Sequence, residues 1–498
     1  MAHNHAIGSA VATLLMTATV IAQCPPASIH IGKDRQEVGF DIAADYNCAV
    51  FGQYFGTSAQ IHELAPSGSW TRVASITSKS PTAKAVGRNV AIGGGTAVAA
   101  DPLDSQNVAS ITIAERSSSG WTTVATFGSP RRHVGFGNAL AVSRDGTLIA
   151  VGNPAYNDDR GIAYVYRKTA QGWTHDGTLS PKLAPSPQDF FGINFAFDGQ
   201  KLLVGAMGTN SYAGSVYVFD KVGSTWTEIA SFTEKSPSAT SFFGSTLQLD
   251  GNRLIASTKD NVLEFARSGS TWTEVGTIVK GQALQISLMG SRLATGTYGR
   301  VEVFDAGATG WTKIASFGYP DGFLSQAQFG PRLALTQTGL LVSAPTWDND
   351  IKVAPSVMGA VCYYDLEDLG KPLVACGHGI HAQYGGSQRL LLDAPALAGQ
   401  PYLVLGSLTG KGPLRVGNVS IPLDYDPYLE FTAAIPNSSF LPRGFGVLDA
   451  RGSAATDFVL PTPFARYLLG HKLHHAFVTL GATGLTSASN AVTIEVGL

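Results

Sequence analysis

Residues 191–232 read FGINFAFDGQKLLVGAMGTNSYAGSVYVFDKVGSTWTEIASF, which is four short segments of alternating apolar residues separated by turns. Asp198-Gly199 is a tight-turn pair between the first two segments, and a polar loop from Gly208 to Ala213 joins the second to the third. Because each segment has the length of a strand and the connections are short, the stretch predicts a four-stranded antiparallel meander.

The Trp-Thr pair in the last segment recurs along the chain. Six of the seven tryptophans are followed by threonine, and the steps between them are 51, 52, 53, 46 and 39 residues. They are Trp70, Trp121, Trp173, Trp226, Trp272 and Trp311. A regular period of this length is typical of propeller blades or solenoid turns.

The glycine that opens each unit gives the number of units. These glycines are Gly39, Gly87, Gly137, Gly192, Gly244 and Gly330. The last step is 86 residues, about twice one unit, and residues 284–304 form a degenerate unit within it, so we count seven. The seventh lacks a Trp-Thr strand, and residues 28–31 can complete it, which predicts a closed ring rather than an open solenoid.

The composition indicates an all-β protein and excludes some partners. Charged residues make up 14% of the 498-residue chain, and there are 57 glycines. The formal net charge is -2, and no run of basic residues is longer than Arg131-Arg132. Without a basic surface, nucleic acid and anionic membranes are not expected partners.

The repeated units resemble the FG-GAP family, whose repeats form the propeller head of integrin α subunits and of many secreted bacterial proteins. The match covers residues from about 36 to 370 and is carried by Phe136-Gly137, Phe191-Gly192, Phe243-Gly244, Phe329-Gly330, Gly205-Ala206 and Ala344-Pro345. The resemblance implies a seven-bladed β-propeller. The calcium loop of integrin-type repeats, Asp-x-Asp-x-Asp-Gly, is absent between the first two strands of each unit, so no cofactor is carried over.

We divide the chain into residues 1–22, a secretory signal peptide; 25–372, the seven-bladed propeller; and 376–498, a β-sandwich of jelly-roll-like type. The signal peptide predicts a secreted or cell-surface protein, and no later apolar run reaches the length of a membrane span. Strands of the sandwich are expected at 389–393, 402–405, 419–423, 429–434, 445–449, 455–460, 474–480 and 491–496.

Four cysteines lie at the two ends of the repeats: Cys24, Cys48, Cys362 and Cys376. In an exported protein this even number predicts two disulfides, with three possible connectivities. Bonds between the early and late pairs would clamp a ring, and the local bonds Cys24–Cys48 and Cys362–Cys376 are equally allowed.

The candidate ligand-binding residues are on the loops between second and third strands, in three units. They are Asn153, Tyr156, Asp158, Asp159, Asn210, Tyr212, Trp347, Asp348 and Asp350. The acidic runs at 157–159 and 348–350 could hold calcium, but turn chemistry explains them without an ion.

Three other motifs are assigned structural roles. The run 471–475 contains three histidines, but its apolar flank predicts a strand with one buried histidine rather than a metal site. Residues 406–412 are similar to a phosphate loop but lack its spacing, its Ser/Thr and a following helix. The repeated tryptophans are expected to pack between blades rather than to stack on sugars.

No known catalytic motif occurs, so we expect a non-enzymatic adhesion or binding protein that recognises an extracellular protein or polysaccharide. The alternative is a secreted carbohydrate-active hydrolase or lyase with two carboxylates about 5–10 Å apart at the ring axis. A third possibility is a structural module of a surface layer.

Overall fold

The computed structural model describes residues 28–31, 37–54, 56–65, 70–78, 85–102, 109–131, 133–199, 201–269, 271–318, 328–346, 359–366, 371–376, 379–482 and 484–497. Nearly all regular elements in these residues are strands, which confirms the all-β prediction. The predicted signal peptide lies outside the described residues. Among the described residues, no helix has both the length and the apolar character needed to cross a bilayer.

Six antiparallel sheets are each built from four consecutive strands. In chain order the sheets are β2 (Val38–Asp45), β3 (Cys48–Gln53), β4 (Ser58–Leu64) and β5 (Trp70–Thr77); β6 (Asn89–Gly93), β7 (Thr96–Asp101), β8 (Ser110–Ser117) and β9 (Gly120–Gly128); β10 (Ala139–Val142), β11 (Leu148–Asn153), β12 (Ile162–Thr169) and β13 (Gly172–Leu179); β14 (Phe191–Asp198), β15 (Lys201–Ala206), β16 (Ser215–Val222) and β17 (Thr225–Phe232); β18 (Thr246–Asp250), β19 (Arg253–Ser257), β20 (Asn261–Ser268) and β21 (Thr271–Lys280); and β22 (Gln285–Met289), β23 (Arg292–Thr297), β24 (Arg300–Gly307) and β25 (Gly310–Phe317).

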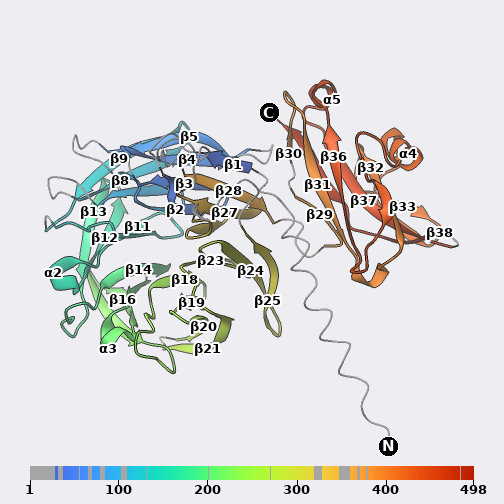
Figure 1. Ribbon diagram of the computed structural model, residues 1–498. Coiled ribbons are helices and arrows are strands. Elements are labelled where there is room, and N and C mark those ends of the chain that lie inside the picture. Colours follow the sequence, from blue (N-terminus) through green and yellow to red (C-terminus); the bar gives the residue numbers. More distant parts are fainter. Residues whose placement is uncertain are drawn as a thin grey trace, which may run out of the picture.

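A seventh sheet joins the two ends of this series. It consists of β26 (Leu333–Leu335), β27 (Gly339–Ala344), β28 (Ala360–Asp365) and the N-terminal strand β1 (Ser28–Ile31). Strand β1 pairs antiparallel with β28, which confirms that residues 28–31 complete the last unit. The first strands of successive sheets contact one another, and β26 contacts β2, so the sheets surround a common axis as in a β-propeller (Figure 1).

Pairs of glycines bring the backbones of neighbouring sheets together near their inner strands. A methyl group on Gly205 in the fourth sheet would overlap the carbonyl oxygen of Gly244, which opens the fifth, and Gly152 has the same relation to Gly192. The opening glycines also have positive φ, 85° at Gly192 and 88° at Gly244. Only glycine allows both the left-handed backbone and the close approach, which explains this part of the repeat.

The repeated tryptophans hold the outer parts of neighbouring sheets together. The Trp121 indole Nε1 donates to Glu63 of the preceding sheet at 3.3 Å, and the Trp173 Nε1 donates to Glu115 at 2.7 Å. A cation from the tryptophan's own sheet binds each of these carboxylates: Arg116 for Glu63 and Lys168 for Glu115. These contacts confirm packing between sheets as the role of the tryptophans.

The third sheet supplies its carboxylate from a different strand. Arg167 occupies the position that corresponds to Glu115, and a β-bulge in β13 leaves Asp176 without a partner opposite it in β12. Asp176 accepts hydrogen bonds from Trp226 Nε1 at 2.9 Å and from Lys221 of the fourth sheet, and from Arg167 of its own sheet. The other five sheets of four consecutive strands have a bulge at the same position, so the third sheet differs in carrying an acidic residue there.

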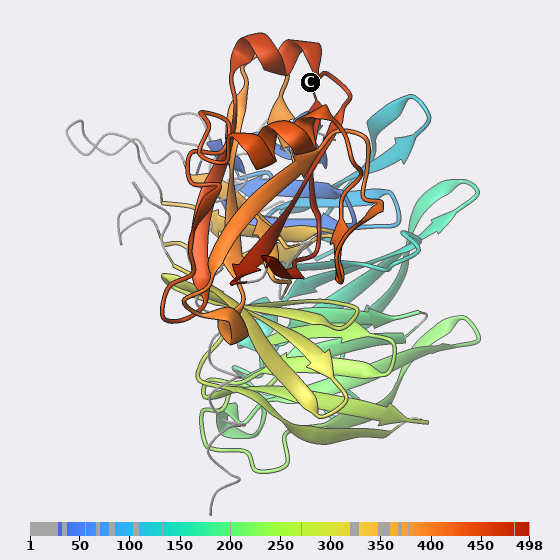
Figure 2. The same cartoon turned by 90° about the vertical axis from the view of Figure 1, so that its right-hand side faces the viewer.

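Residues 373–497 form a separate group of sheets beside the ring in Figure 1, and this group faces the viewer in the turned view of Figure 2. One sheet contains β29 (Leu373–Ala375), β31 (Gly386–Asp393) and β36 (Ser453–Leu460); the other contains β30 (Gly379–His381), β39 (Val492–Gly497), β37 (Lys472–Gly481), β32 (Pro401–Ser407) and β35 (Phe445–Val447), with β38 (Gly484–Ala488) on β37. The remaining elements are the hairpin β33 (Pro413–Val416) and β34 (Val419–Pro422), and the helices η2 (Pro395–Leu397), α4 (Pro427–Ala434) and α5 (Thr462–Tyr467).

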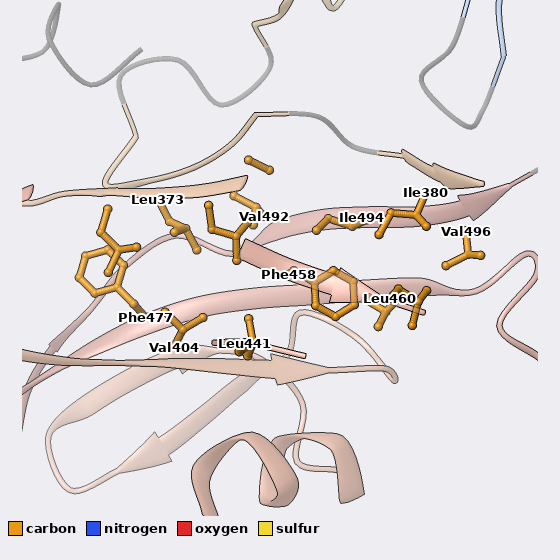
Figure 3. Packing of buried hydrophobic residues seen from close by; sticks show 14 of the residues in the cluster. Leu373, Ile380, Val404, Leu441, Phe458, Leu460, Phe477, Val492, Ile494 and Val496 are labelled. Atoms are coloured by element: carbon orange, nitrogen blue, oxygen red, sulfur yellow. The ribbon is translucent and has the colours of Figure 1, made fainter. Parts of the chain in front are cut away.

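Both of these sheets contribute to one buried apolar cluster. Phe458 and Leu460 come from the first sheet, and Val404, Phe477 and Ile494 come from the second (Figure 3). The two sheets therefore pack on a shared core.

The strand predicted at 429–434 is wrong, because these residues lie in helix α4. The Asp426 side chain accepts a hydrogen bond from the Leu429 backbone N–H, and Pro427 occupies the first turn. An Asp cap followed by proline is a helix-start signal, and here it outweighs the β-prone composition of the segment.

The predicted set of two disulfides is also wrong. Cys48 in β3 and Cys362 in β28 are buried free thiols. Burial raises the pKa of each thiol to about 12, so both are unreactive. Both local pairings are thereby excluded. A bond between Cys376 and Cys24 stays a prediction, because Cys24 lies outside the described residues.

The contact between sheets predicts that alanine destabilises the protein more at Gly205 than at a glycine outside the contact. Gly205→Ala is expected to lower the free energy of unfolding by about 1–3 kcal/mol, because a methyl group there overlaps the neighbouring backbone. Gly276→Ala in β21 is the matched control, since nothing lies within 4 Å of a methyl group at that position. Urea denaturation would measure both, and equal effects of the two changes would contradict the proposed role of the glycine pair.

The Asp176 contacts predict a pH-dependent stability. Burial raises the pKa of Asp176, but the hydrogen bonds from Lys221, Trp226 and Arg167 outweigh this effect and hold the pKa below its usual 3.8. We expect Asp176→Asn to lower the free energy of unfolding at pH 7 by about 1.5–3 kcal/mol. The difference should shrink as the pH falls below 3.8 towards the lowered pKa, because the wild-type carboxylate is then protonated.

The control for this change is Asp220→Asn in the fourth sheet, where the carboxylate forms a partly exposed ion pair with Lys201. Its effect should stay below about 1 kcal/mol. Urea titrations at pH 7 and at acidic pH would compare the two variants, and an effect of Asp176→Asn that did not change with pH would refute the charged contact.

Candidate functional site: the loops on one face of the ring

Two of the predicted loops, labelled α2 (Tyr156–Asp159) and α3 (Thr209–Tyr212), adopt the same unusual backbone conformation on neighbouring sheets. Residues 157–159 have φ from 52° to 60°, and residues 210–212 have φ from 55° to 68°. Each loop is thus a short left-handed turn made without glycine. Left-handed backbone costs non-glycine residues roughly 1–2 kcal/mol each, although Asn and Asp tolerate it best.

Backbone hydrogen bonds from the following connection hold both turns in place. The Asp158 and Asp159 carbonyls accept from the N–H groups of Gln188 and Phe190, at 3.1 and 2.8 Å. In the next sheet, the Tyr212 carbonyl accepts from the N–H of Phe242 at 2.8 Å. The left-handed turns point their carbonyls at the connection that leads into the next sheet, so the loops are fixed rather than free.

The loop of the third sheet gathers polar and aromatic side chains around Tyr156. The Tyr156 hydroxyl accepts a hydrogen bond from Arg131 Nη1 at 3.0 Å, and the guanidinium carbon is 5.4 Å from the ring centroid. The His133 ring packs edge-on at 5.3 Å, and the buried Asn153 amide lies next to His133. The structure thus brings together two predicted residues, Tyr156 and Asn153, with two that sequence reasoning did not select.

The loop of the fourth sheet is built differently around Tyr212. The Tyr212 hydroxyl donates to Gln188 Oε1 at 2.8 Å, and its ring packs edge-on against Phe242 at 5.6 Å. Asn210 and Ser211 are exposed at the tip, as Asn157 and Asp158 are in the third sheet. Trp347, Asp348 and Asp350 of the third predicted loop lie outside the described residues.

The missed residues carry only weak sequence signals. Arg131 and His133 lie in the connection before Phe136-Gly137, where no repeated motif marks them. Gln188 lies in the equivalent connection of the next unit. Among the described residues, no group of three or more His, Cys, Asp or Glu side chains is arranged to hold a metal ion.

The opposite mouth of the ring is crossed by Arg144, which lies in the β10–β11 turn. Its Nη1 is 3.5 Å from Asp250 Oδ1 of the fifth sheet, and its Nη2 donates to the Tyr46 hydroxyl of the first sheet at 3.2 Å. The hydrogen bond with Tyr46 raises the pKa of Arg144 most, and the charges of Tyr46 and Asp250 add to this rise. This contact pairs a carboxylate with a cation, whereas glycoside cleavage needs a pair of carboxylates.

The loop at 406–412 binds a carboxylate of the protein itself. Asp426 is buried and accepts from the backbone N–H groups of Leu408 and Thr409, at 2.6 and 2.9 Å, and from the Ser407 hydroxyl at 2.9 Å. Burial raises the pKa of Asp426, but these bonds outweigh it and lower the pKa overall. The backbone donors of this loop therefore serve an internal anion, in agreement with the rejection of a phosphate loop.

The histidine run also has a structural role. His475 in β37 is fully buried, and its Nε2 forms a hydrogen bond with the Tyr428 hydroxyl at 2.9 Å. Burial, with a smaller contribution from neighbouring His474, lowers the pKa of His475 to about 3. The prediction of a strand with one buried histidine is confirmed.

Comparison with known proteins adds no family. No family model matches the chain, and no curated protein matches it. Among solved structures, the crystal structure of a protein from Lactobacillus plantarum is 15% identical and covers 64% of this chain and 100% of its own length, with a TM-score of 0.42. At this TM-score the likeness carries no argument about function.

The buried His475 predicts loss of stability in acid. Below pH 6.5 the unfolded histidine takes up a proton while the folded one does not, so stability falls with pH, by up to about 1.4 kcal/mol per unit. His475→Gln cannot be protonated and should flatten this slope between pH 6.5 and 4. The exposed His471→Gln is the control, and unfolding curves with the same slope for both variants would disprove the prediction.

Proposed function

We propose that the protein is a secreted, non-enzymatic recognition protein that binds an extracellular protein or polysaccharide through the ring face carrying α2 and α3. In this proposal the seven four-stranded sheets are the blades of one FG-GAP-type propeller, and the two sheets of residues 373–497 form a β-sandwich beside it. The glycine contacts between sheets support the family assignment. The glycine of a Gly-Ala pair in one sheet packs against the glycine of the Phe-Gly pair that opens the next sheet, so both parts of the motif serve the same contact.

The observation that carries the functional proposal is the matched strain in two neighbouring loops. Three consecutive residues in each loop have a left-handed backbone, and none of the six is glycine. They are residues 157–159 and 210–212. Strain of this kind persists where the surrounding structure over-determines it, and it concentrates at binding sites. Glycine at these positions would relieve the strain, so the retained side chains have a use beyond closing the turn.

The side chains at the loop tips are suited to recognition. Asn157, Asp158, Asn210 and Ser211 are exposed polar groups on a backbone that hydrogen bonds hold fixed. Tyr156 and Tyr212 stand behind them with anchored hydroxyl groups. A fixed polar and aromatic surface loses little conformational entropy when it binds a partner.

The test is a binding screen of the mature protein against glycan, cell-wall and extracellular-protein arrays. Two double variants, Asn157→Ala with Asp158→Ala and Asn210→Ala with Ser211→Ala, remove the loop tips. At least one should lose tenfold or more in affinity for the ligand found, because these side chains provide its polar contacts.

Ser119→Ala in the β8–β9 turn is the control, since this exposed residue lies on the opposite face of the ring. It should bind as the wild type does. Wild-type binding by both loop variants, or equal loss in the control, would refute recognition through this face.

A further inference from the structure

We propose that the part of residues 373–497 that carries helix α5 docks on the surface of a lipid bilayer with anionic headgroups. We call this surface the α5 end. The inference goes beyond the proposed function, because it assigns a second binding surface on a different group of sheets. Three features carry it: exposed apolar and aromatic side chains, an arginine without a carboxylate partner, and the place of the helix at an end of the molecule.

Helix α5 is apolar on two sides, and only one of them faces the core. Ala465 is fully buried and Leu468, three residues later, packs against the same apolar cluster. Phe464 and Tyr467, also three residues apart, lie on the outer side, where 53% and 85% of their surfaces are exposed. A surface helix in water normally has polar residues on its outer side, so this outer side suits apolar surroundings.

Neighbouring segments extend the apolar surface. The Thr462 hydroxyl donates to the Tyr384 carbonyl at 2.8 Å, which places Tyr384 beside the start of α5, and 69% of Tyr384 is exposed. Leu469 follows the helix and is 46% exposed. Phe440 packs edge-on against Phe464 at 5.3 Å. Contiguous exposed apolar surface of this kind marks a site of contact with a protein or a membrane.

The segments that form the α5 end contain no acidic residue. Residues 382–388, 435–444 and 461–472 have neither Asp nor Glu, although the chain has 36 acidic residues. The exposed Arg466 lies between Phe464 and Tyr467 in the helix. The apolar side chains are thus accompanied by a cation.

Two carboxylates from neighbouring strands face this surface, and both already have partners. Asp457 pairs with Arg443 at 3.4 Å, and Glu495 pairs with Lys472 at 3.6 Å. Arg466 forms no ion pair in the part of the chain that the structure describes, so its charge is available to a partner. The sequence alone does not indicate this surface, because no run of basic residues marks it and its residues come from separate segments.

The position of α5 favours a bilayer over an acidic protein. Figure 1 shows α5 at the upper end of these sheets, and it keeps this place in the turned view of Figure 2. Apolar side chains at a projecting end can enter a flat, soft layer, whereas a folded partner would need a hollow of matching shape. Tyrosine rings prefer the level of the headgroups, and arginine attracts anionic lipids. A helix of six residues cannot span a bilayer, so the protein would lie on its surface.

The experiment measures co-sedimentation of the full mature protein with phosphatidylcholine vesicles, with and without phosphatidylglycerol. The vesicles that contain phosphatidylglycerol should bind about fivefold more tightly, which is the contribution of one arginine near an anionic surface. High salt should remove this preference. Arg466→Gln should bind both kinds of vesicle equally, while Arg466→Lys should keep the preference. Lys182→Gln, which changes an exposed cation of the ring, is the control and should behave as the wild type does.

The apolar contribution is tested separately. The double change Tyr467→Ser with Leu469→Ser should lower the affinity for both kinds of vesicle tenfold or more, because these side chains no longer enter the bilayer. Tyr298→Ser is the matched control, since Tyr298 is 61% exposed on the ring. Thermal unfolding is measured in parallel, and Tyr467→Ser alone decides the result if the double variant unfolds.

No binding to vesicles, wild-type binding by the variants of Tyr467, or an equal loss in Tyr298→Ser would overturn the inference. A preference for phosphatidylglycerol that persists in Arg466→Gln would also overturn it, as would an acidic protein or soluble polymer that binds the α5 end while vesicles do not. The loop-tip variants of the ring should bind vesicles as the wild type does, so this inference and the proposed function can fail independently.

Discussion

Neighbouring sheets of the ring touch through their backbones, and this close approach is the constraint on which the rest of the structure depends. Gly152 against Gly192 and Gly205 against Gly244 leave no room for a side chain. A sheet that sits this close to the next one has a fixed position, and its loops inherit that position. Closure follows from the same geometry, because the last sheet must meet the first, and β1 supplies the strand that completes it.

Farther from the axis, the same interaction is built from different residues. A tryptophan indole donates to a carboxylate of the preceding sheet in four places, yet the carboxylate comes from equivalent strand positions only for Glu63 and Glu115. Asp176 reaches the space between sheets from the bulge in β13. In the fifth sheet, Ala266 occupies the strand position that corresponds to Glu63 and Glu115, and Glu264, two residues before it, supplies the carboxylate. These four contacts have the indole donor and the charged acceptor in common, while the position that supplies the acceptor differs. The Trp70 Nε1 has no hydrogen-bond partner among the described residues.

The candidate site consists of two loops whose strained backbone is held by the neighbouring sheets. The two left-handed turns do not follow from local preference alone, since the carbonyls of residues 158, 159 and 212 are aimed at N–H groups of the next connection. The residues that donate, such as Phe190 and Phe242, are themselves left-handed. Loop and connection therefore hold each other in conformations that neither would adopt alone, and this gives Arg131, Tyr156 and Tyr212 defined positions at the surface.

The sequence by itself determined the repeat, the meander in each unit and the strand that completes the ring, because these depend on local alternation, turn residues and spacing. It also marked Asn153, Tyr156 and Tyr212 through their place in the loops. The partners of these residues, Arg131, His133 and Gln188, and the contact of Asp176 with Trp226 of the next sheet were decided only by the tertiary structure. They depend on contacts between units that no periodic pattern encodes. For the same reason the sequence could not show that Cys48 and Cys362 are buried free thiols, because this depends on where the folded sheets place them.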